Sequence, residues 1–138
     1  SAVDLSEAAL RVARGNAERL GLAVDFHAGS WWQPLAGRVF DLVLSNPPYI
    51  AGGDPHLAAL HHEPTLALTP GGDGLGAIRE IVAGAPAHLA PGGWLLLEQG
   101  YDQAEAVTAL LRAQGFEAVS TRHDLAGQTR CTGGRRAG

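Results

Sequence analysis

The sequence predicts an α/β fold built on a parallel, doubly wound sheet. Segments with strand patterning alternate with amphipathic helical segments along most of the 138 residues. Two of the strand segments are nearly continuous apolar runs, which are typical of strands covered on both faces. Ligands on such sheets bind beyond the carboxyl ends of the strands, so polar residues at those ends are the first candidates for a site.

The N-terminal part of the chain is expected to carry three strands and one helix. Residues 1–4 have the pattern of a strand end. Ser6 is expected to cap a helix that stops at Gly21, because serine is a favoured N-cap and glycine a favoured residue after a helix. Residues 22–27 alternate as a short strand does, and residues 39–45 are almost entirely apolar.

The rest of the chain begins with residues 50–72, which lack periodicity and are expected to form a long loop, either functional or disordered. Asp73 is expected to cap a helix that ends near Gly84, and Pro86 to kink or restart it before Leu89. The remaining expectations are a Pro91–Gly93 turn, a strand at 94–98, a helix at 103–114, a strand at 116–121 and a last hairpin strand after Asp124, weakened by Gly133 and Gly134.

Composition limits the class of protein. A hydrophobic fraction of 46% and a charged fraction of 17% predict one globular domain over residues 1–138. The net charge of −4 gives no electrostatic footprint for broad nucleic-acid binding. One cysteine excludes an internal disulfide and a multi-cysteine zinc site. No apolar run approaches the ~20 residues of a membrane span, so we expect a cytoplasmic protein without membrane contact.

The stretch VLSNPPY, residues 43–49, ends an apolar strand in an amide, two prolines and an aromatic ring. The Asn46 side-chain oxygen accepts one N–H, and the Pro47 carbonyl, held extended by Pro48, accepts a second. The ring of Tyr49 fits against a flat group. Bonding both hydrogens of a conjugated –NH₂ turns its lone pair toward an electrophile. The alternative interpretation is a Pro-Pro turn leaving a sheet.

Other polar and aromatic residues are weaker candidates. Asp4 follows a strand and could accept hydrogen bonds from ribose hydroxyls, or could be a solvated turn residue. One of Trp31 and Trp32 could pack against adenine, the other in the core. Glu63 could brace a substrate or its own loop. Glu98, at a strand end, could be functional or structural.

Neither a metal site nor a phosphate loop is predicted. The spacing of His56, His61, His62 and Glu63 fits no common ligand set, so we expect no metal. The glycine-rich stretch at 71–76 lacks the lysine of a phosphate-binding loop, and Asp73 as a helix cap accounts for it.

Together these stretches resemble the PrmC/HemK family, the peptide chain release factor glutamine N5-methyltransferases. The resemblance runs to about Arg130 and rests, in order, on VDLSEAAL, NAERLG, GSWWQPL, FDLVLSNPPYI, HHEPTLAL, GGDGLGAIREI, LAPGGWLLLEQGYDQ and GFEAVSTRHDLAGQTR. The NPPY motif is shared with many methyltransferases acting on DNA and RNA bases. EPTLAL, GGDGL and DLAGQTR are more particular to the glutamine enzymes.

The resemblance implies a class I S-adenosylmethionine-dependent methyltransferase with a Rossmann-like sheet. It implies methyl transfer to the side-chain amide nitrogen of the Gln in the Gly-Gly-Gln motif of release factors, and thus a role in translation termination. The implied catalytic residues are Asn46, Pro47, Pro48 and Tyr49. The implied cofactor-binding residues are Asp4, Ser30, Trp31 and Asn46, with Ser30 standing where an acidic residue is common. Asn46, Pro47, Tyr49 and Glu63 are implied to contact the substrate.

The same resemblance implies a single, N-terminally truncated catalytic domain over residues 1–138. The family's first strand and glycine-rich motif should precede Ser1, and the chain contains no methionine. We therefore expect this chain by itself to bind S-adenosylmethionine weakly or not at all. Release factors are the expected partners. Contact with nucleic acid is expected only through a ribosome-associated substrate. An exposed sheet edge could favour an oligomer. Two alternatives stay open: a methyltransferase of adenine or cytosine in nucleic acid, and an inactive fragment that only packs or scaffolds.

Overall fold

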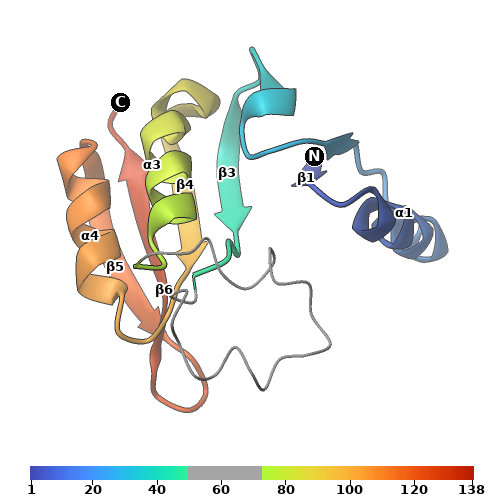
Figure 1. The fold of residues 1–138 in the computed structure, drawn as a ribbon. Coiled ribbons are helices and arrows are strands. Elements are labelled where there is room, and N and C mark those ends of the chain that lie inside the picture. Colours follow the sequence, from blue (N-terminus) through green and yellow to red (C-terminus); the bar gives the residue numbers. More distant parts are fainter. Residues whose placement is uncertain (50–72) are drawn as a thin grey trace. The chain divides into compact units, whose positions relative to one another are not determined.

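The computed structural model describes residues 1–49 and 73–138 (Figure 1). These residues form two compact units, Ser1–Arg38 and Val39–Gly138. The predicted loop at 50–72, with the histidine cluster and Glu63, lies outside the described residues. No helix within the described ranges is long and apolar enough to cross a membrane.

The first unit contains β1 (Ala2–Asp4), α1 (Glu7–Leu20), β2 (Phe26–Ala28) and a short 3-10 helix, η1 (Gln33–Leu35). Strands β1 and β2 pair in parallel, with Asp4 opposite Ala28. The predicted caps of α1 are confirmed. Ser6 Oγ accepts the Ala9 N–H at 3.2 Å, and Gly21 adopts the left-handed conformation with φ 65°. The strand predicted at 22–27 is shorter and shifted, because only residues 26–28 pair with β1.

The second unit contains β3 (Phe40–Ser45), α3 (Gly76–His88), β4 (Leu89–Glu98), α4 (Ala104–Ala113), β5 (Phe116–His123) and β6 (Thr129–Arg136). Its sheet has the strand order β3-β4-β6-β5. β3 and β4 are parallel, whereas β6 runs antiparallel to both of its neighbours. The α/β prediction is thus confirmed. The sheet is mixed rather than wholly parallel, and its antiparallel strand is the hairpin strand that the sequence predicted after Asp124.

Both helices of this unit lie on the same side of its sheet (Figure 1). Alternate residues of β4, Leu95 and Leu97, are fully buried on that side. They share the core with apolar residues of α3 and α4, namely Ile78, Ile81, Val82, Ala85, Val107 and Leu111. The interior of the unit is therefore a single helix-on-sheet layer.

The opposite face of β3 differs from the prediction that this strand is covered on both sides. Leu42 is 52% exposed and Leu44 is 68% exposed. The reason is that α3 and α4 pack on the other face. Within the described residues, β3 also pairs only with β4, so it forms an edge of this four-stranded sheet.

The predicted helix end at Gly84 and strand start at 94 are also wrong. α3 continues to His88 with Pro86 in its last turn, where buried Ala85 holds the helix against the core. β4 begins at Leu89, which pairs with Phe40 before the register shifts. The predicted Pro91–Gly93 turn thus becomes an irregularity within the strand.

Gly133 and Gly134, which the sequence predicted to weaken the last strand, both lie within β6. Both are buried within the sheet. A Cβ at Gly133 would collide with the side chain of Leu96, and one at Gly134 would lie 3.0 Å from the Cβ of Phe116. Side chains from the flanking strands thus lie over these glycines, and a larger residue at either position would have to displace them.

Candidate active site

The NPPY segment begins where β3 ends. Ser45 pairs with Leu97 of the parallel strand β4, so the next residues, Asn46 and Glu98, leave the same end of the sheet. Asn46 is exposed, whereas the side chain of Pro47 is fully buried. Burial of this ring and the fixed proline φ give the segment a defined backbone path.

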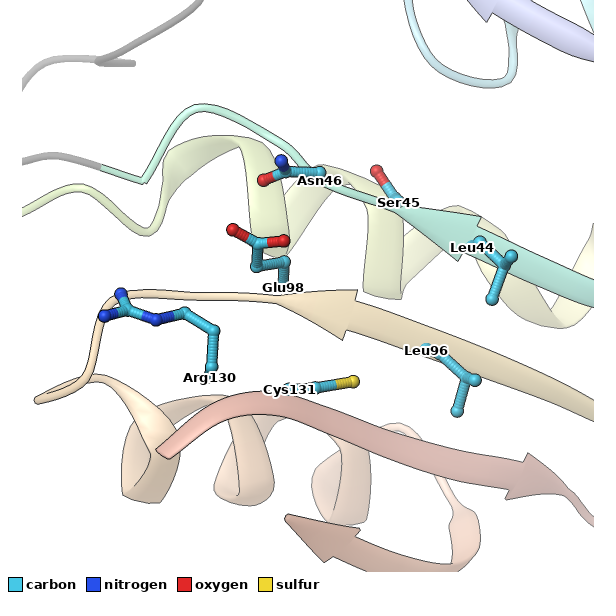
Figure 2. A pocket seen from close by; sticks show the side chains of 7 residues that line it. All are labelled: Leu44, Ser45, Asn46, Leu96, Glu98, Arg130 and Cys131. Atoms are coloured by element: carbon cyan, nitrogen blue, oxygen red, sulfur yellow. The ribbon is translucent and has the colours of Figure 1, made fainter. Parts of the chain in front are cut away.

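A pocket of about 310 Å³ opens at this end of the sheet (Figure 2). Figure 2 shows the Asn46 carboxamide and the Glu98 carboxylate on facing walls of it. The lining residues come from β3, the following Asn46, β4 and β6, and are Leu44, Ser45, Asn46, Leu96, Glu98, Arg130 and Cys131. The pocket thus combines an apolar floor with an amide, a carboxylate and a guanidinium, which suits a polar planar group.

Tyr49 is bonded at both its side chain and its main chain. Its hydroxyl donates to Glu98 Oε1 at 3.0 Å, and its carbonyl accepts from Gln103 Nε2 at 2.9 Å. Burial is the main cause that raises the pKa of Tyr49 above 10.0, and the bonded Glu98 carboxylate adds to it, while Arg130 acts in the opposite direction. The phenol therefore stays protonated and remains a donor at neutral pH.

The DLAGQTR stretch, residues 124–130, forms the turn between β5 and β6. Asp124 Oδ1 accepts the N–H groups of Ala126 and Gln128, both at 2.9 Å, and Asp124 Oδ2 accepts from Arg130 Nε at 3.4 Å. The Gln128 amide is the main group that lowers the pKa of Asp124. One aspartate thus orders the turn and holds Arg130, whose side chain lines the pocket beside Glu98 (Figure 2).

Of the residues predicted to bind cofactor, Asp4, Ser30 and Trp31 lie in the first unit, and Asn46 lies in the second. Asp4 is exposed at the end of β1, and its Oδ1 accepts the Ser6 N–H at 2.7 Å. Asp4 pairs with Ala28 at the carboxyl end of the two parallel strands. Ser30 and Trp31, which follow β2, therefore leave the same end of the sheet as Asp4. Trp31 has a positive φ of 45°, a strained conformation for a bulky residue and one found preferentially at functional sites.

Sequence reasoning left Glu98 open between a functional and a structural role and did not single out Gln103, Arg130 or Asp124. For Asp124 and Arg130 a signal existed, because both belong to the distinctive DLAGQTR stretch. Gln103 also had a signal, because it ends LAPGGWLLLEQGYDQ, one of the stretches on which the resemblance rests. The roles predicted for Asp4, Ser30, Trp31 and the NPPY residues stay predictions.

The chain belongs to the methyltransferase small domain family, whose model matches residues 1–119. It is 54% identical over 137 residues to the release factor glutamine methyltransferase of Xylella fastidiosa, with 97% of this chain and 50% of that protein covered. It is 53% identical to the protein of the same name from Bordetella pertussis, with 97% and 51% covered. The chain spans about half the length of the curated relatives it matches. The resemblance drawn from the sequence is confirmed.

Solved structures show the same fold. The release-factor-specific protein-(glutamine-N5) methyltransferase of Alicyclobacillus acidocaldarius matches with a TM-score of 0.55 and 27% identity, over 99% of this chain and 78% of that one. A methyltransferase from Pyrococcus furiosus matches with a TM-score of 0.69 and 19% identity, over 98% and 61% of the two chains, a likeness of fold alone. The predicted class I methyltransferase fold is confirmed.

Proposed function

We propose that the protein carrying this chain transfers a methyl group from S-adenosylmethionine to the side-chain amide nitrogen of the Gln in the Gly-Gly-Gln motif of release factors. The observation that carries the proposal is the exposed Asn46, placed directly after β3 on the wall of a pocket. Family membership and relatives at 54% and 53% identity support it. We infer that residues 1–138 form part of one catalytic domain. Because release factors act in the cytoplasm, we also infer a cytoplasmic location for the protein.

The amide nitrogen of glutamine is a poor nucleophile, because its lone pair is conjugated with the carbonyl. S-adenosylmethionine, when bound, supplies an electrophilic methyl group. The oxygens of Asn46 and Pro47 accept the two hydrogens of the substrate –NH₂, Pro48 keeps Pro47 extended, and the ring of Tyr49 lies against the amide plane. Two acceptors also stabilise the positive charge that develops on nitrogen, and the proton then leaves to water or a nearby acceptor.

The residues of the first unit fit the cofactor that the family implies. Asp4 has one oxygen committed to Ser6, so its Oδ2 is the atom that would accept a ribose hydroxyl. Ser30 and Trp31 follow the neighbouring strand at the same edge, and the strained backbone of Trp31 supports a role for its ring beside adenine. Glu63 is proposed to contact the substrate on its sequence position alone.

Asn46→Ala in the full-length protein that carries this chain tests the proposal. We expect kcat for a purified release factor to fall about 10²- to 10³-fold, because one acceptor for the developing charge is lost. Cofactor affinity, measured by calorimetry, should change far less. The exposed Asn16→Ala on α1 is the matched control. Equal loss of turnover and affinity, or loss of neither, would contradict the assigned role of Asn46.

The substrate class needs a separate assay. Labelled cofactor is offered with release factor in one reaction and with nucleic acid containing adenine and cytosine in another. Label in the release factor alone is the expected result. Label in nucleic acid alone would identify a base methyltransferase, and label in neither, with the fold intact, would identify an inactive scaffold.

A further inference from the structure

The NPPY segment is a short bridge between two fixed points. At one end, Ser45 is held in the sheet opposite Leu97. At the other end, Tyr49 is held by the Glu98 carboxylate at 3.0 Å and the Gln103 amide at 2.9 Å. Two of the three residues that follow Asn46 are prolines, whose φ angles are fixed. Fixing both ends of such a segment also determines the direction of its carbonyl groups.

Gln103 is itself fixed, because it uses both ends of its carboxamide. Nε2 donates to the Tyr49 carbonyl, and Oε1 accepts the Gly100 N–H at 2.9 Å. Gln103 also stands at the N-cap position of α4. The side chain therefore connects the NPPY segment to the turn between β4 and α4. Rotation of the carboxamide would break both hydrogen bonds at once.

The β5–β6 hairpin contributes a charged residue to the pocket that Glu98 lines. Arg130 lines the same pocket and is held by Asp124 in the β5–β6 turn. Glu98 accepts the Tyr49 hydroxyl at 3.0 Å, and a hydrogen bond to a carboxylate is stronger than one to a neutral acceptor. Asp124 thus holds Arg130 on the wall of the pocket that Glu98 also lines, and Glu98 in turn accepts the Tyr49 hydroxyl.

We propose that Glu98 and Gln103 are positioning residues for the methyl transfer, acting through Tyr49 to aim the Asn46 and Pro47 oxygens at the substrate amide. This inference rests on the proposed function. It gives the hydroxyl of Tyr49 a tethering role, separate from the role of its ring. It also gives the DLAGQTR turn a role, because Asp124 in that turn holds Arg130, which lines the same pocket as Glu98.

A double-mutant cycle in the full-length protein tests the Glu98 tether. Tyr49→Phe keeps the ring and removes the donor, and Glu98→Gln removes the charged acceptor. We expect each change to lower kcat by roughly tenfold to about 100-fold without changing cofactor affinity, because a small misplacement of reacting groups has effects of that size. The double variant should be no slower than the slower single variant, since both remove one contact. Tyr101→Phe, at an exposed tyrosine nearby in the chain, is the matched control and should leave kcat unchanged.

Gln103→Ala tests the second tether, with the exposed Gln114→Ala at the other end of α4 as its control. Gln103→Ala should lower kcat, again without changing cofactor affinity, and Gln114→Ala should not. Multiplicative losses in the Tyr49 and Glu98 cycle, or full activity in both Tyr49→Phe and Gln103→Ala, would overturn the inference.

A spectroscopic readout separates failure of this inference from failure of the proposed function. The NMR signal of the Asn46 side-chain amide should shift in Tyr49→Phe and Gln103→Ala and stay in place in Tyr101→Phe. Titration of a ¹³C-labelled Tyr49 should show its raised pKa moving down toward 10.0 in Glu98→Gln. A wild-type protein that methylates no release factor would refute the proposed function, and unshifted Asn46 signals would refute the tether independently.

Discussion

Gln99 offers a sharp test of the packing described above. Its side chain is completely buried directly after β4, and within the described residues neither Nε2 nor Oε1 of its carboxamide has a hydrogen-bond partner. Its backbone N–H donates to the Arg130 carbonyl at 3.0 Å and does not depend on the side chain. A buried polar group without a partner costs about 1–3 kcal/mol.

Gln99→Leu replaces this carboxamide with an apolar side chain of similar volume. We expect the free energy of unfolding to rise by about 1–3 kcal/mol, because the penalty of the unpaired amide is removed while the core stays filled. Urea unfolding followed by circular dichroism measures the change at constant slope with denaturant. The exposed Gln114→Leu is the control and should stay within about 0.5 kcal/mol of the parent protein. Destabilisation by Gln99→Leu would show that the carboxamide has partners and would refute the reasoning.

Two further predictions concern local stability. The hydrogen bond from Arg79 is the main cause, and the one from the Leu75 N–H the next, that lowers the pKa of Asp73 from 3.8 to about 2. The stabilisation that these bonds give to the start of α3 is therefore present above pH 3.8 and is lost as the pH falls through about 2. NMR titration of the Asp73 carboxyl carbon should show this pKa, and Arg79→Ala should return it toward 3.8. Gly134→Ala should destabilise the protein by about 1–3 kcal/mol, because the new methyl group would lie 3.0 Å from the Cβ of Phe116, an atom that cannot move without the main chain. Gly15→Ala, with open space around its Cα in α1, should instead stabilise by about 1 kcal/mol; urea unfolding that shows the same sign for both would contradict the packing.

Features set by neighbouring residues were predictable from the sequence. The Ser6 cap and the Gly21 end of α1 follow from side-chain chemistry within one turn, and both are confirmed. The position of Asn46 at the end of β3 followed in the same way, because an apolar run stops there at an amide and two prolines. Such signals act over a few residues, so one sequence is enough to see them.

Features set by distant residues were not predictable. Gly133 reads as a strand breaker until Leu96 of the neighbouring strand is seen to occupy the space above it. The bond between Tyr49 and Glu98 joins residues 49 positions apart, and periodicity carries no information about such a pair. An apolar run such as β3 likewise does not reveal which of its faces a helix will cover.

The open side of β3 has a practical consequence for handling residues 39–138. Leu42 and Leu44 give this strand an exposed apolar surface. Within the described residues, its free edge also carries main-chain groups without a partner strand, and this combination lets edge strands pair with one another. Preparations of this stretch alone should precipitate as concentration rises and brighten dyes that bind apolar surface. Leu42→Lys should improve solubility without touching the core or the pocket.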